Sequence, residues 1–212
     1  MDSLIGVVPD EWSEHRLGET CEIQAGPSGA SLPSKEFTEQ GIPLIRPGDI
    51  VDRRVSDTGL AHLTAPTAGR LHRYRLRPGD LVGTRTGTLG RFALVSTNQQ
   101  DWLYSTQLLR VRPSDRVDPV FLVHFLSLPG IRSWIDRHAS GSTVKSITMG
   151  SLSSLPIALP PLRMQRVIGA SLDALDDKAR LHAEIGRTTG ELRSALAPLL
   201  FSGRMAAPDI DT

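Results

Sequence analysis

Side chains that could bind phosphate groups or the edges of bases are concentrated in two polar loops. The first loop, Thr84–Arg91, reads Thr-Arg-Thr-Gly-Thr-Leu-Gly-Arg, and the second reads Gly-Ser-Thr-Val-Lys over residues 141–145. Short hydroxyls and single cations donate hydrogen bonds to phosphate oxygens and to base edges, so both loops are candidates for nucleic-acid contact. The alternative is a pair of structural hairpins whose glycines only supply left-handed backbone conformations.

Arginine is the second candidate for this chemistry. Residues 46–116 contain 12 arginines, no lysine and six aspartates, which gives this segment a net charge of +6, although the whole chain carries only +1. The planar guanidinium group suits phosphates and guanine edges better than the lysine ammonium does. A genome rich in G and C also favours arginine codons, so the bias has two explanations.

The sequence lacks the usual constellations of a catalytic or metal site. The loop at residues 83–90 has no Gly-Lys-Ser/Thr and precedes a predicted strand, which disfavours a P-loop and nucleotide hydrolysis. The six histidines have no metal-ligand spacing, no Gly-x-Ser-x-Gly elbow occurs, and no pair of acids is accompanied by lysine as in a nuclease. Pro160-Pro161 lies between two leucines, so the Asn/Asp-Pro-Pro-aromatic motif of adenine methyltransferases is also missing. The sequence therefore predicts a binding protein and no bound metal or cofactor.

Composition sets the class of protein. The 212 residues are 39% hydrophobic and 22% charged, which is typical of a soluble globular chain. No apolar run reaches the roughly 20 residues that span a membrane, and the N-terminus has no secretory signal pattern. Cys21 is the single cysteine, so no internal disulfide is possible and a cytoplasmic location is expected. We expect Cys21 to be a small buried side chain, and Trp12, Trp102 and Trp134 to belong to the core rather than to stack on bases.

Strands are predicted mainly between residues 40 and 112, and helices follow them. Turn residues and apolar runs predict strands at 41–46, 81–83, 92–95 and within 102–111, with Pro-Gly-Asp turns at 47–49 and 78–80. Residues 52–70 are expected to be mostly loop with one helical turn. Asp118-Pro119 predicts the start of a helix over 120–128, and a second short helix is expected at 131–138. This order predicts an α+β domain with a mixed or antiparallel sheet.

A proline-rich connector precedes a long helical pattern. Pro156, Pro160 and Pro161 disfavour helix and predict an extended segment, with Pro161 in the first turn of the helix that follows. The helix is expected to run for roughly 35 residues, or about 50 Å at 1.5 Å per residue. Its apolar residues recur at the spacing of a coiled-coil seam, with His182 and Thr189 as weak members. The seam residues are Ile168, Leu172, Leu175, Ala179, Ile185, Leu192, Leu196 and Leu199.

This helix needs a partner surface. Gly169, Gly186 and Gly190 each cost about 1 kcal/mol relative to alanine in a helix interior, and isolated helices are marginally stable in water. The seam favours another helix of the same kind as the partner. The alternative is an ordinary C-terminal helix packed on its own domain.

The order of these motifs resembles the specificity subunit of type I restriction-modification systems, in the part that forms one target-recognition domain and one long helix. The likeness covers about residues 9–205, and it is strongest at Leu-Pro-Ile-Ala-Leu-Pro-Pro-Leu over residues 155–162 with Gln165 behind it. The other matching pieces are Trp12, Leu17-Gly18, Ile23, Gly26, the run from Gly41 to Ile50, Gly79 to Val82, Arg85-Thr86-Gly87, Gly90-Arg91, Asp118-Pro119, Phe121, Leu126, Gly141-Ser142, Ile147, Ile168, Leu172, Leu175-Asp176, and Leu196 to Gly203. Family members typically carry two recognition domains and two such helices, so the resemblance implies half a specificity subunit.

The resemblance implies a DNA-recognition subunit without catalytic activity that binds double-stranded DNA. It also implies a separate adenine methyltransferase subunit carrying S-adenosylmethionine, a translocating nuclease subunit as a further partner, and a homodimer formed by the long helices. Its expected domains are residues 1–157 for target recognition, 158–205 for the connector and dimerisation helix, and 206–212 as a disordered tail. The expected DNA-contacting residues are Arg53, Arg54, Arg70, Arg73, Thr84, Arg85, Thr86, Arg91, Ser142, Thr143 and Lys145. The alternative function is a module that assembles a complex without DNA through its helical arm.

Overall fold

The computed structural model describes residues 2–29, 32 and 36–204. The chain divides into two compact units, residues 1–170 and residues 171–212, which we call the head and the arm. The tail expected at residues 206–212 lies outside the described residues. Each unit is treated separately below.

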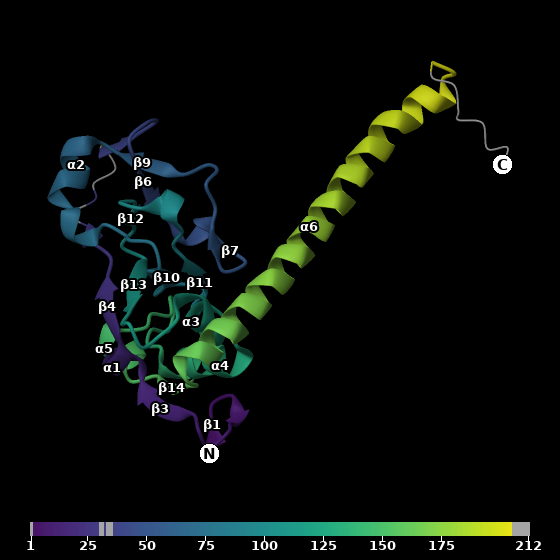
Figure 1. The fold of residues 1–212 in the computed structure, drawn as a ribbon. Helices are drawn as coiled ribbons and strands as arrows, with labels where there is room; N and C mark the ends of the chain where they lie inside the picture. The colour runs from purple at the N-terminus through teal and green to yellow at the C-terminus, as the bar shows by residue number, and fades with distance from the viewer. Residues whose placement is uncertain (1, 30–31, 33–35, 205–212) are drawn as a thin grey trace. The chain divides into compact units, whose positions relative to one another are not determined.

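The head is built on a six-stranded sheet (Figure 1). Its order is β4 (Cys21–Ala25), β13 (Leu108–Pro113), β10 (Leu81–Thr84), β11 (Phe92–Leu94), β8 (Arg54–Val55) and β7 (Ile50–Val51). A four-stranded sheet has the order β12 (Leu103–Tyr104), β6 (Ile42–Ile45), β9 (Ala61–Leu63) and β5 (Phe37–Thr38). Each sheet contains one parallel pair, β11 with β8 and β12 with β6, and is otherwise antiparallel, which confirms the α+β class with mixed sheets.

Short helices complete the head. They are α1 (Leu17–Thr20), α2 (Ala65–Arg70), α3 (Pro119–Leu126), α4 (Pro129–His138) and α5 (Met149–Ser153), and a small hairpin joins β1 (Asp2–Ser3) to β2 (Gly6–Val7). The helices predicted at 120–128 and 131–138 are confirmed as α3 and α4. As expected from the Asp-Pro pair, the Asp118 carboxylate accepts a hydrogen bond from the Phe121 amide at 2.9 Å and caps α3.

The interior of the head has two hydrophobic clusters on opposite faces of the six-stranded sheet. Neighbouring residues of β10 alternate between them, because Leu81 belongs to the cluster that includes α3 and α4, and Val82 belongs to the cluster that includes α2 and β6. Such a strand is buried on both faces, and its apolar run Leu81-Val82 followed by Gly83 explains why β10 is readily predicted.

The tryptophans belong to these clusters, as expected. Trp134 is 7% exposed in the first cluster, where Trp12 also packs, and Trp102 packs against the second.

The expectation of a loop over residues 52–70 is wrong in part. The strands β8 and β9 lie within this range, whereas the helical turn expected there is present as α2. β8 has two residues and β9 has three, so neither is long enough to show an alternating pattern in the sequence. Their pairing with β7, β11 and β6 defines them.

Both Pro-Gly-Asp segments form the same turn. The Asp49 carboxylate accepts a hydrogen bond from the Arg46 amide at 2.7 Å, and the Asp80 carboxylate accepts one from the Arg77 amide at 2.8 Å. The first turn is a short 3-10 helix, Pro47–Asp49. The repeat therefore reflects local turn chemistry, in which aspartate satisfies backbone donors.

The proline connector is extended, as predicted, and it forms a strand. β14 (Pro156–Leu159) pairs antiparallel with β3 (Ser13–Arg16) near the N-terminus. The helix α6 begins at Leu162, so Pro161 precedes it and does not occupy its first turn. The Pro161 carbonyl accepts the first helical hydrogen bonds, from Met164 at 2.7 Å and from Gln165 at 3.1 Å.

The helix α6 (Leu162–Phe201) has 40 residues, five more than the estimate from the sequence. Within the head, Gly169 approaches α3 so closely that a Cβ atom there would lie 2.7 Å from the Phe121 amide nitrogen. Glycine at this position costs helix propensity but permits the contact. Cβ atoms at Gly186 and Gly190 would meet no atom within 4 Å.

Gln165 joins three segments of the head. Gln165 is only 2% exposed, and its Oε1 accepts a hydrogen bond from the Asp118 amide at 2.8 Å. Its Nε2 donates to the carbonyl of Arg116 at 3.1 Å and to that of Pro160 at 2.9 Å. This explains physically why a glutamine follows the proline connector.

We expect Gln165→Ala to lower the free energy of unfolding by about 2–3 kcal/mol, because it leaves a buried amide and two carbonyls without their partner. Urea denaturation followed by circular dichroism would measure this. Gln100→Ala is the control, because Gln100 is exposed. Gln24→Ala is unsuitable, because the Gln24 side chain accepts a hydrogen bond from the Tyr104 hydroxyl. Gln165→Ala and Gln100→Ala with equal denaturation midpoints would contradict this role.

Cys21 is a buried thiol, as expected, and we expect it to be unreactive in the folded protein. Burial raises its pKa from 9.0 to about 11, although a hydrogen bond with Thr20 opposes this. Iodoacetamide at pH 8 should therefore label native protein much more slowly than protein in denaturant. The folded state retains this proton at higher pH than the unfolded state. The associated stability is therefore present below pH 9 and is lost as pH rises through about 11. Labelling that is equally fast with and without denaturant would exclude a buried thiol.

Candidate nucleic-acid interface

The two polar loops predicted from the sequence lie side by side in the head. One connects β10 to β11 and the other connects α4 to α5. The Gly87 amide donates to the Lys145 carbonyl at 3.0 Å, and the Ile147 amide donates to the Arg85 carbonyl at 2.9 Å. Thr86 and Ser146 form an antiparallel bridge between these hydrogen bonds. The backbone therefore makes one continuous surface from loops that are far apart in the sequence.

The loop after α4 forms a tight, exposed turn. Ser140 and Ser146 exchange backbone hydrogen bonds of 2.8 and 2.7 Å and close its base. Gly141 has a φ of +104°, and a Cβ atom there would lie 2.3 Å from the Val144 carbonyl oxygen. This turn therefore requires glycine at residue 141.

Three of the predicted DNA-contacting residues, Ser142, Thr143 and Lys145, lie on this turn and are exposed. The Lys145 ammonium lies 3.6 Å from the Asp136 carboxylate on α4, and both side chains are more than half exposed. Such an exposed pair contributes little stability and opens readily for a phosphate or a base edge. We call residues 141–145 the exposed turn.

The predicted residues of the first loop are less accessible. Thr84 is only 2% exposed, and its hydroxyl accepts a hydrogen bond from the Arg91 amide at 3.2 Å. The Thr86 hydroxyl oxygen and the Arg85 Nε are also buried, without a hydrogen-bond partner among the described residues. This corrects the expectation that Thr84 and Thr86 present hydroxyls at the surface. The exposed hydroxyl residue of this loop is Thr88, which is outside the predicted set.

Two hollows adjoin this loop, and both are lined by Thr88 and Arg91. The first has a volume of about 470 Å³ and includes Arg46 and the exposed Gln107. The second has a volume of about 330 Å³ and includes Arg53 and Arg132. We call the second one, which is lined by Arg53, Arg91 and Arg132, the arginine hollow.

Arg53 and Arg91 are both fixed by the β7–β8 hairpin. Arg53 has a φ of +64° and follows Asp52 with a φ of +44°, so two consecutive residues that are not glycine adopt left-handed conformations in the turn. The Arg91 guanidinium donates a hydrogen bond to the Ile50 carbonyl of the same hairpin. The structure thus brings these two predicted residues together at one hollow.

The remaining predicted arginines have other surroundings. Arg54 is exposed on β8. Arg70, at the end of α2, donates to the Thr67 hydroxyl at 3.0 Å and lies 3.6 Å from the Glu36 carboxylate. Arg73 donates to the Tyr74 hydroxyl at 2.6 Å and lies over the same ring. In Figure 1, α2 lies beside β6 and β9, whereas the two polar loops follow β10 and α4.

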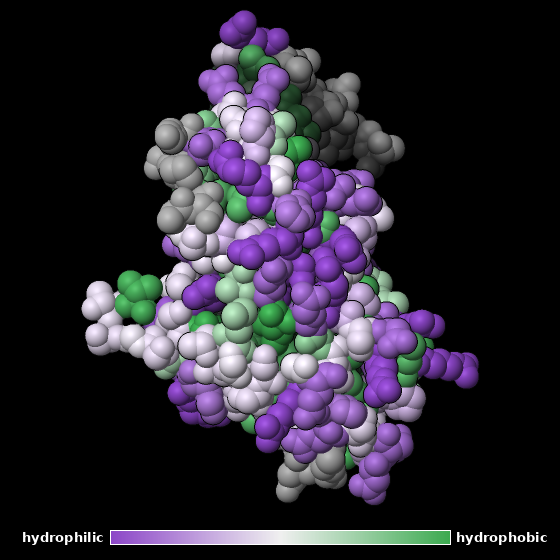
Figure 2. Space-filling view, turned by 90° about the vertical axis from the view of Figure 1, so that its left-hand side faces the viewer, coloured by the Kyte–Doolittle hydropathy of each residue, from purple (hydrophilic) through white to green (hydrophobic). Residues whose placement is uncertain are grey.

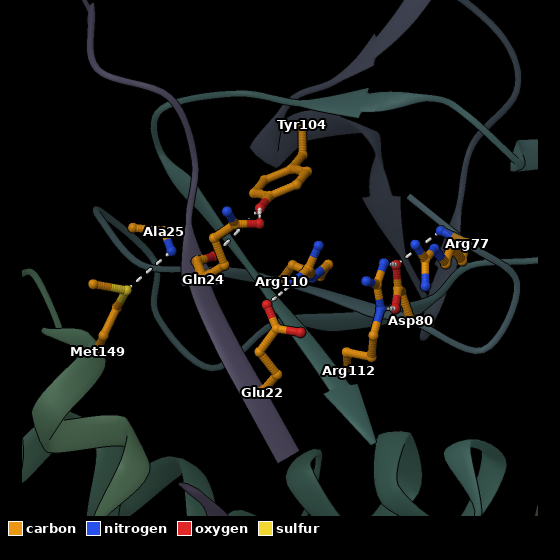
Figure 3. A network of polar contacts seen from close by, with 9 residues as sticks. All are labelled: Glu22, Gln24, Ala25, Arg77, Asp80, Tyr104, Arg110, Arg112 and Met149. Atoms are coloured by element: carbon orange, nitrogen blue, oxygen red, sulfur yellow. Dashed lines mark hydrogen bonds and ion pairs between the residues drawn. The ribbon is translucent and has the colours of Figure 1, made fainter. Parts of the chain in front are cut away.

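Several arginines of the basic segment are structural (Figure 3). Arg112 binds both oxygens of Asp80, at 2.6 and 2.7 Å, and Asp80 is 1% exposed. Arg110 is 3% exposed and pairs with Glu22 across the β13–β4 pair. The bond to Asp80 raises the pKa of Arg112. Asp80 is already counted in the +6 charge of residues 46–116, whereas Glu22 lies outside this segment and offsets one of its positive charges.

The same network continues along β4. The Tyr104 hydroxyl donates to the Gln24 side chain at 3.0 Å, and burial raises the pKa of Tyr104 far above its ordinary value. The Ala25 amide donates to the Met149 sulfur at 3.1 Å.

Hydrophilic residues gather across the middle of the face shown in Figure 2.

Within the described residues, no group of three or more histidine, cysteine, aspartate or glutamate side chains could hold a metal ion. No helix in that same part of the chain combines the length and apolar character needed to cross a membrane. The features of the interface are therefore cations, hydroxyls and amides around two joined loops.

Comparison with known proteins shows the family of this chain. A family model described as a type I restriction modification DNA specificity domain matches residues 9–187. The chain belongs to this family. This confirms the resemblance found in the motifs and in the proline connector.

Curated members of the specificity-domain family match at low identity. The EcoBI specificity subunit of Escherichia coli is 23% identical over 176 residues, covering 82% of this chain and 37% of the relative. The putative MjaX specificity subunit of Methanocaldococcus jannaschii is 25% identical over 211 residues, covering 96% and 45%. The chain spans half or less of the length of these relatives.

Solved structures from the same family show the same fold. A structure titled for complex assembly and conformational transition of the type I R-M system matches with a TM-score of 0.66 and 26% identity, over 92% of this chain and 45% of that chain. The HsdS subunit from Thermoanaerobacter tengcongensis matches with a TM-score of 0.59 and 23% identity, over 92% and 44%.

Arg46, Thr88, Gln107 and Arg132 line the hollows but are outside the predicted set. Thr88 belongs to the glycine-rich loop, so the same loop pattern could have indicated it. Arg132 lies on α4, and nothing in its local sequence distinguishes it from Arg137 on the same helix. Its position beside Arg53 and Arg91 depends on the packing of α4 against the sheet.

Proposed function

We propose that this protein is a DNA sequence-recognition subunit without catalytic activity, which directs a separate adenine methyltransferase subunit to its site. S-adenosylmethionine would bind to that partner, and a translocating nuclease subunit is a further partner in this proposal. Residues 1–157 would recognise DNA, and residues 158–205 would connect and pair two copies. The proposed place of action is the cytoplasm, where the DNA is.

The observation that carries the proposal is the joining of the two polar loops beside two arginine-lined hollows. Family membership supports DNA as the ligand. The exposed turn carries donors and one cation on a backbone fixed by hydrogen bonds to the neighbouring loop. Side chains held in this way are suited to base edges, where each good bidentate contact is worth about 1–3 kcal/mol of discrimination.

The arm supports the second part of the proposal, a homodimer. The seam residues Leu175, Ile185 and Leu192 are 63%, 61% and 57% exposed. A stripe of large apolar side chains along a helix is stable when another helix covers it. A second copy would supply a helix with the same seam.

The spacing of the seam favours antiparallel pairing about an axis between residues 183 and 184. In that arrangement large apolar residues meet large apolar residues of the second copy, because Ile168 meets Leu199, Leu172 meets Leu196, and Leu175 meets Leu192. The two weak members, Thr189 and His182, meet the seam residues Ala179 and Ile185 of the second copy.

Charge supports the same direction. A parallel pair would place the acidic group Asp173, Asp176 and Asp177 beside its own copy. An antiparallel pair about this axis places it opposite residues 190–194, which contain Arg193 and the single acid Glu191, so the three acids face a segment without net charge. Two heads related by such a twofold axis would read a split inverted repeat, since palindromy follows protein symmetry.

Selection of bound duplexes from a random pool tests the proposal. We expect an enriched site made of two inverted half-sites with a fixed spacer. One contiguous asymmetric site would contradict the symmetric pairing. Absence of any binding to duplexes at physiological salt would contradict DNA recognition and favour a protein-assembly module.

A further inference from the structure

The arginine hollow has the features of an anion site. Its three cations come from three separate segments: Arg53 from the β7–β8 turn, Arg91 from the loop just before β11, and Arg132 from α4. Asp52 is the acid that also lines the hollow, so the residues lining it carry an excess of positive charge. Arg132 is exposed and is assigned no role by the family match or by the sequence motifs.

From this geometry we infer that the arginine hollow holds one phosphate of the DNA backbone and that Arg132 is one of its binding residues. The inference rests on the proposed function and assigns a role to one part of its interface. It separates this hollow, which would bind phosphate, from the exposed turn, which would read bases.

The concave shape favours a phosphate over a base edge. The phosphates form the ridges of a DNA duplex, whereas the base edges lie at the bottom of its grooves. A hollow of about 330 Å³ can therefore receive a ridge, while a base edge needs a projecting element such as the exposed turn. Arginine matches phosphate through bidentate hydrogen bonds, which are stronger when charge-assisted.

The arginines are also held in position before a ligand arrives. The hydrogen bond to the Ile50 carbonyl anchors Arg91, and the left-handed backbone sets the direction of Arg53. A residue other than glycine in this conformation costs about 1 kcal/mol or more, and such strain often occurs at ligand clamps. A Cβ atom at Gly90 would lie 3.3 Å from Arg132 Cγ, so glycine leaves space for the stem of Arg132.

The hollow has a fixed position relative to the exposed turn. The first loop lines the hollow with Thr88, Leu89 and Arg91. In the same loop, the Gly87 amide donates a hydrogen bond to the Lys145 carbonyl. A phosphate held in the hollow would therefore set where the exposed turn meets the bases. Phosphate contacts fix register in this way and carry no sequence information themselves.

The test compares Arg132→Gln with Arg137→Gln, which removes the same charge from the same helix but does not line the hollow. Binding of the full chain to the selected duplex and to its single-base variants is measured by fluorescence anisotropy at several salt concentrations. We expect Arg132→Gln to weaken all duplexes about tenfold or more, by an equal factor. Its salt slope should fall by about 0.9 for each head bound. Arg137→Gln should bind like the unaltered protein, and Arg132→Lys should retain the slope.

A second measurement identifies the phosphate itself. Single methylphosphonate substitutions, which remove the charge of one phosphate, are moved along the selected duplex. We expect one position in each half-site where the substitution weakens the unaltered protein but does not further weaken Arg132→Gln. The thermal unfolding midpoint of each variant controls for damage to the fold.

The outcomes separate the two claims. If Arg132→Gln binds like Arg137→Gln, or if it changes the order of base preferences, the hollow is not a phosphate site although DNA recognition stands. If the two variants differ but no methylphosphonate position distinguishes Arg132→Gln from the unaltered protein, the phosphate assignment also fails. If the unaltered protein binds no duplex, the proposed function itself fails.

Discussion

Replacing both Leu175 and Leu192 with glutamate is expected to separate the proposed dimer into monomers and to weaken binding to a two-part site by about 10²–10⁴-fold. The two leucines are 63% and 57% exposed in a single copy and meet each other twice in the proposed antiparallel pair. Four carboxylates would then lie in an apolar seam without partners, which disfavours association. The second head would no longer bind as part of the same molecule, so its contribution to affinity is lost.

Sedimentation velocity and binding to the selected duplex measure these two effects. Ala183→Glu with Ser194→Glu is the matched control, because it adds the same charge to exposed positions of α6 outside the seam. The control should remain dimeric, and binding of the seam variant to an isolated half-site should be unchanged. A leucine variant that still sediments as a dimer would exclude this seam as the interface.

Replacing Asp80 with asparagine is expected to lower the free energy of unfolding by about 3–5 kcal/mol, because removing one partner of a buried ion pair leaves the other charge uncompensated. Asp80 is 1% exposed and holds Arg112 through both oxygens. The asparagine carbonyl can still accept from the Arg77 amide, so most of the loss should come from Arg112. For a chain of this length the unfolding midpoint should fall by about 10 °C.

Thermal unfolding of three variants measures the cost of leaving one charge of this pair uncompensated. The variants are Asp80→Asn, Arg112→Leu, and the double variant Asp80→Leu with Arg112→Leu. The double variant should be more stable than Asp80→Asn, since an apolar pair leaves no charge unpaired. Asp57→Asn, at an exposed aspartate, serves as the control. A midpoint for Asp80→Asn within about 2 °C of that control would show that the pair is not important for stability.

Much of the head could be predicted because its main elements carry local signals. β10 is buried on both faces and begins with the apolar pair Leu81-Val82, and α3 begins where Asp118 caps it. Both polar loops were also identified from their glycines and hydroxyls. Predictions were weaker where a strand has only two or three residues, as in β8 and β9, since such strands are defined by their neighbours.

At the candidate interface, residue type alone does not show which polar side chains are available for DNA. Counting charge over residues 46–116 treats all arginines alike, yet Arg110 and Arg112 are paired inside the sheet, whereas Arg53, Arg91 and Arg132 meet at one hollow. Residue type alone could not reveal that Thr84 is buried or that Thr88 is exposed. Thr84 is buried because it belongs to β10, where it pairs with Leu108 of β13, whereas Thr88 lies in the loop beyond the strand.

The sequence by itself determined the family, the extended proline connector, the long helix and the presence of two polar loops, because these follow from spacing and turn chemistry within short segments. Only the tertiary structure decided which polar side chains lie together, how Gln165 joins three segments, and why Gly169 must be glycine. The physical reason is that these contacts connect residues far apart in the chain. Their geometry depends on sheet order and packing, which leave no periodic pattern in the local sequence.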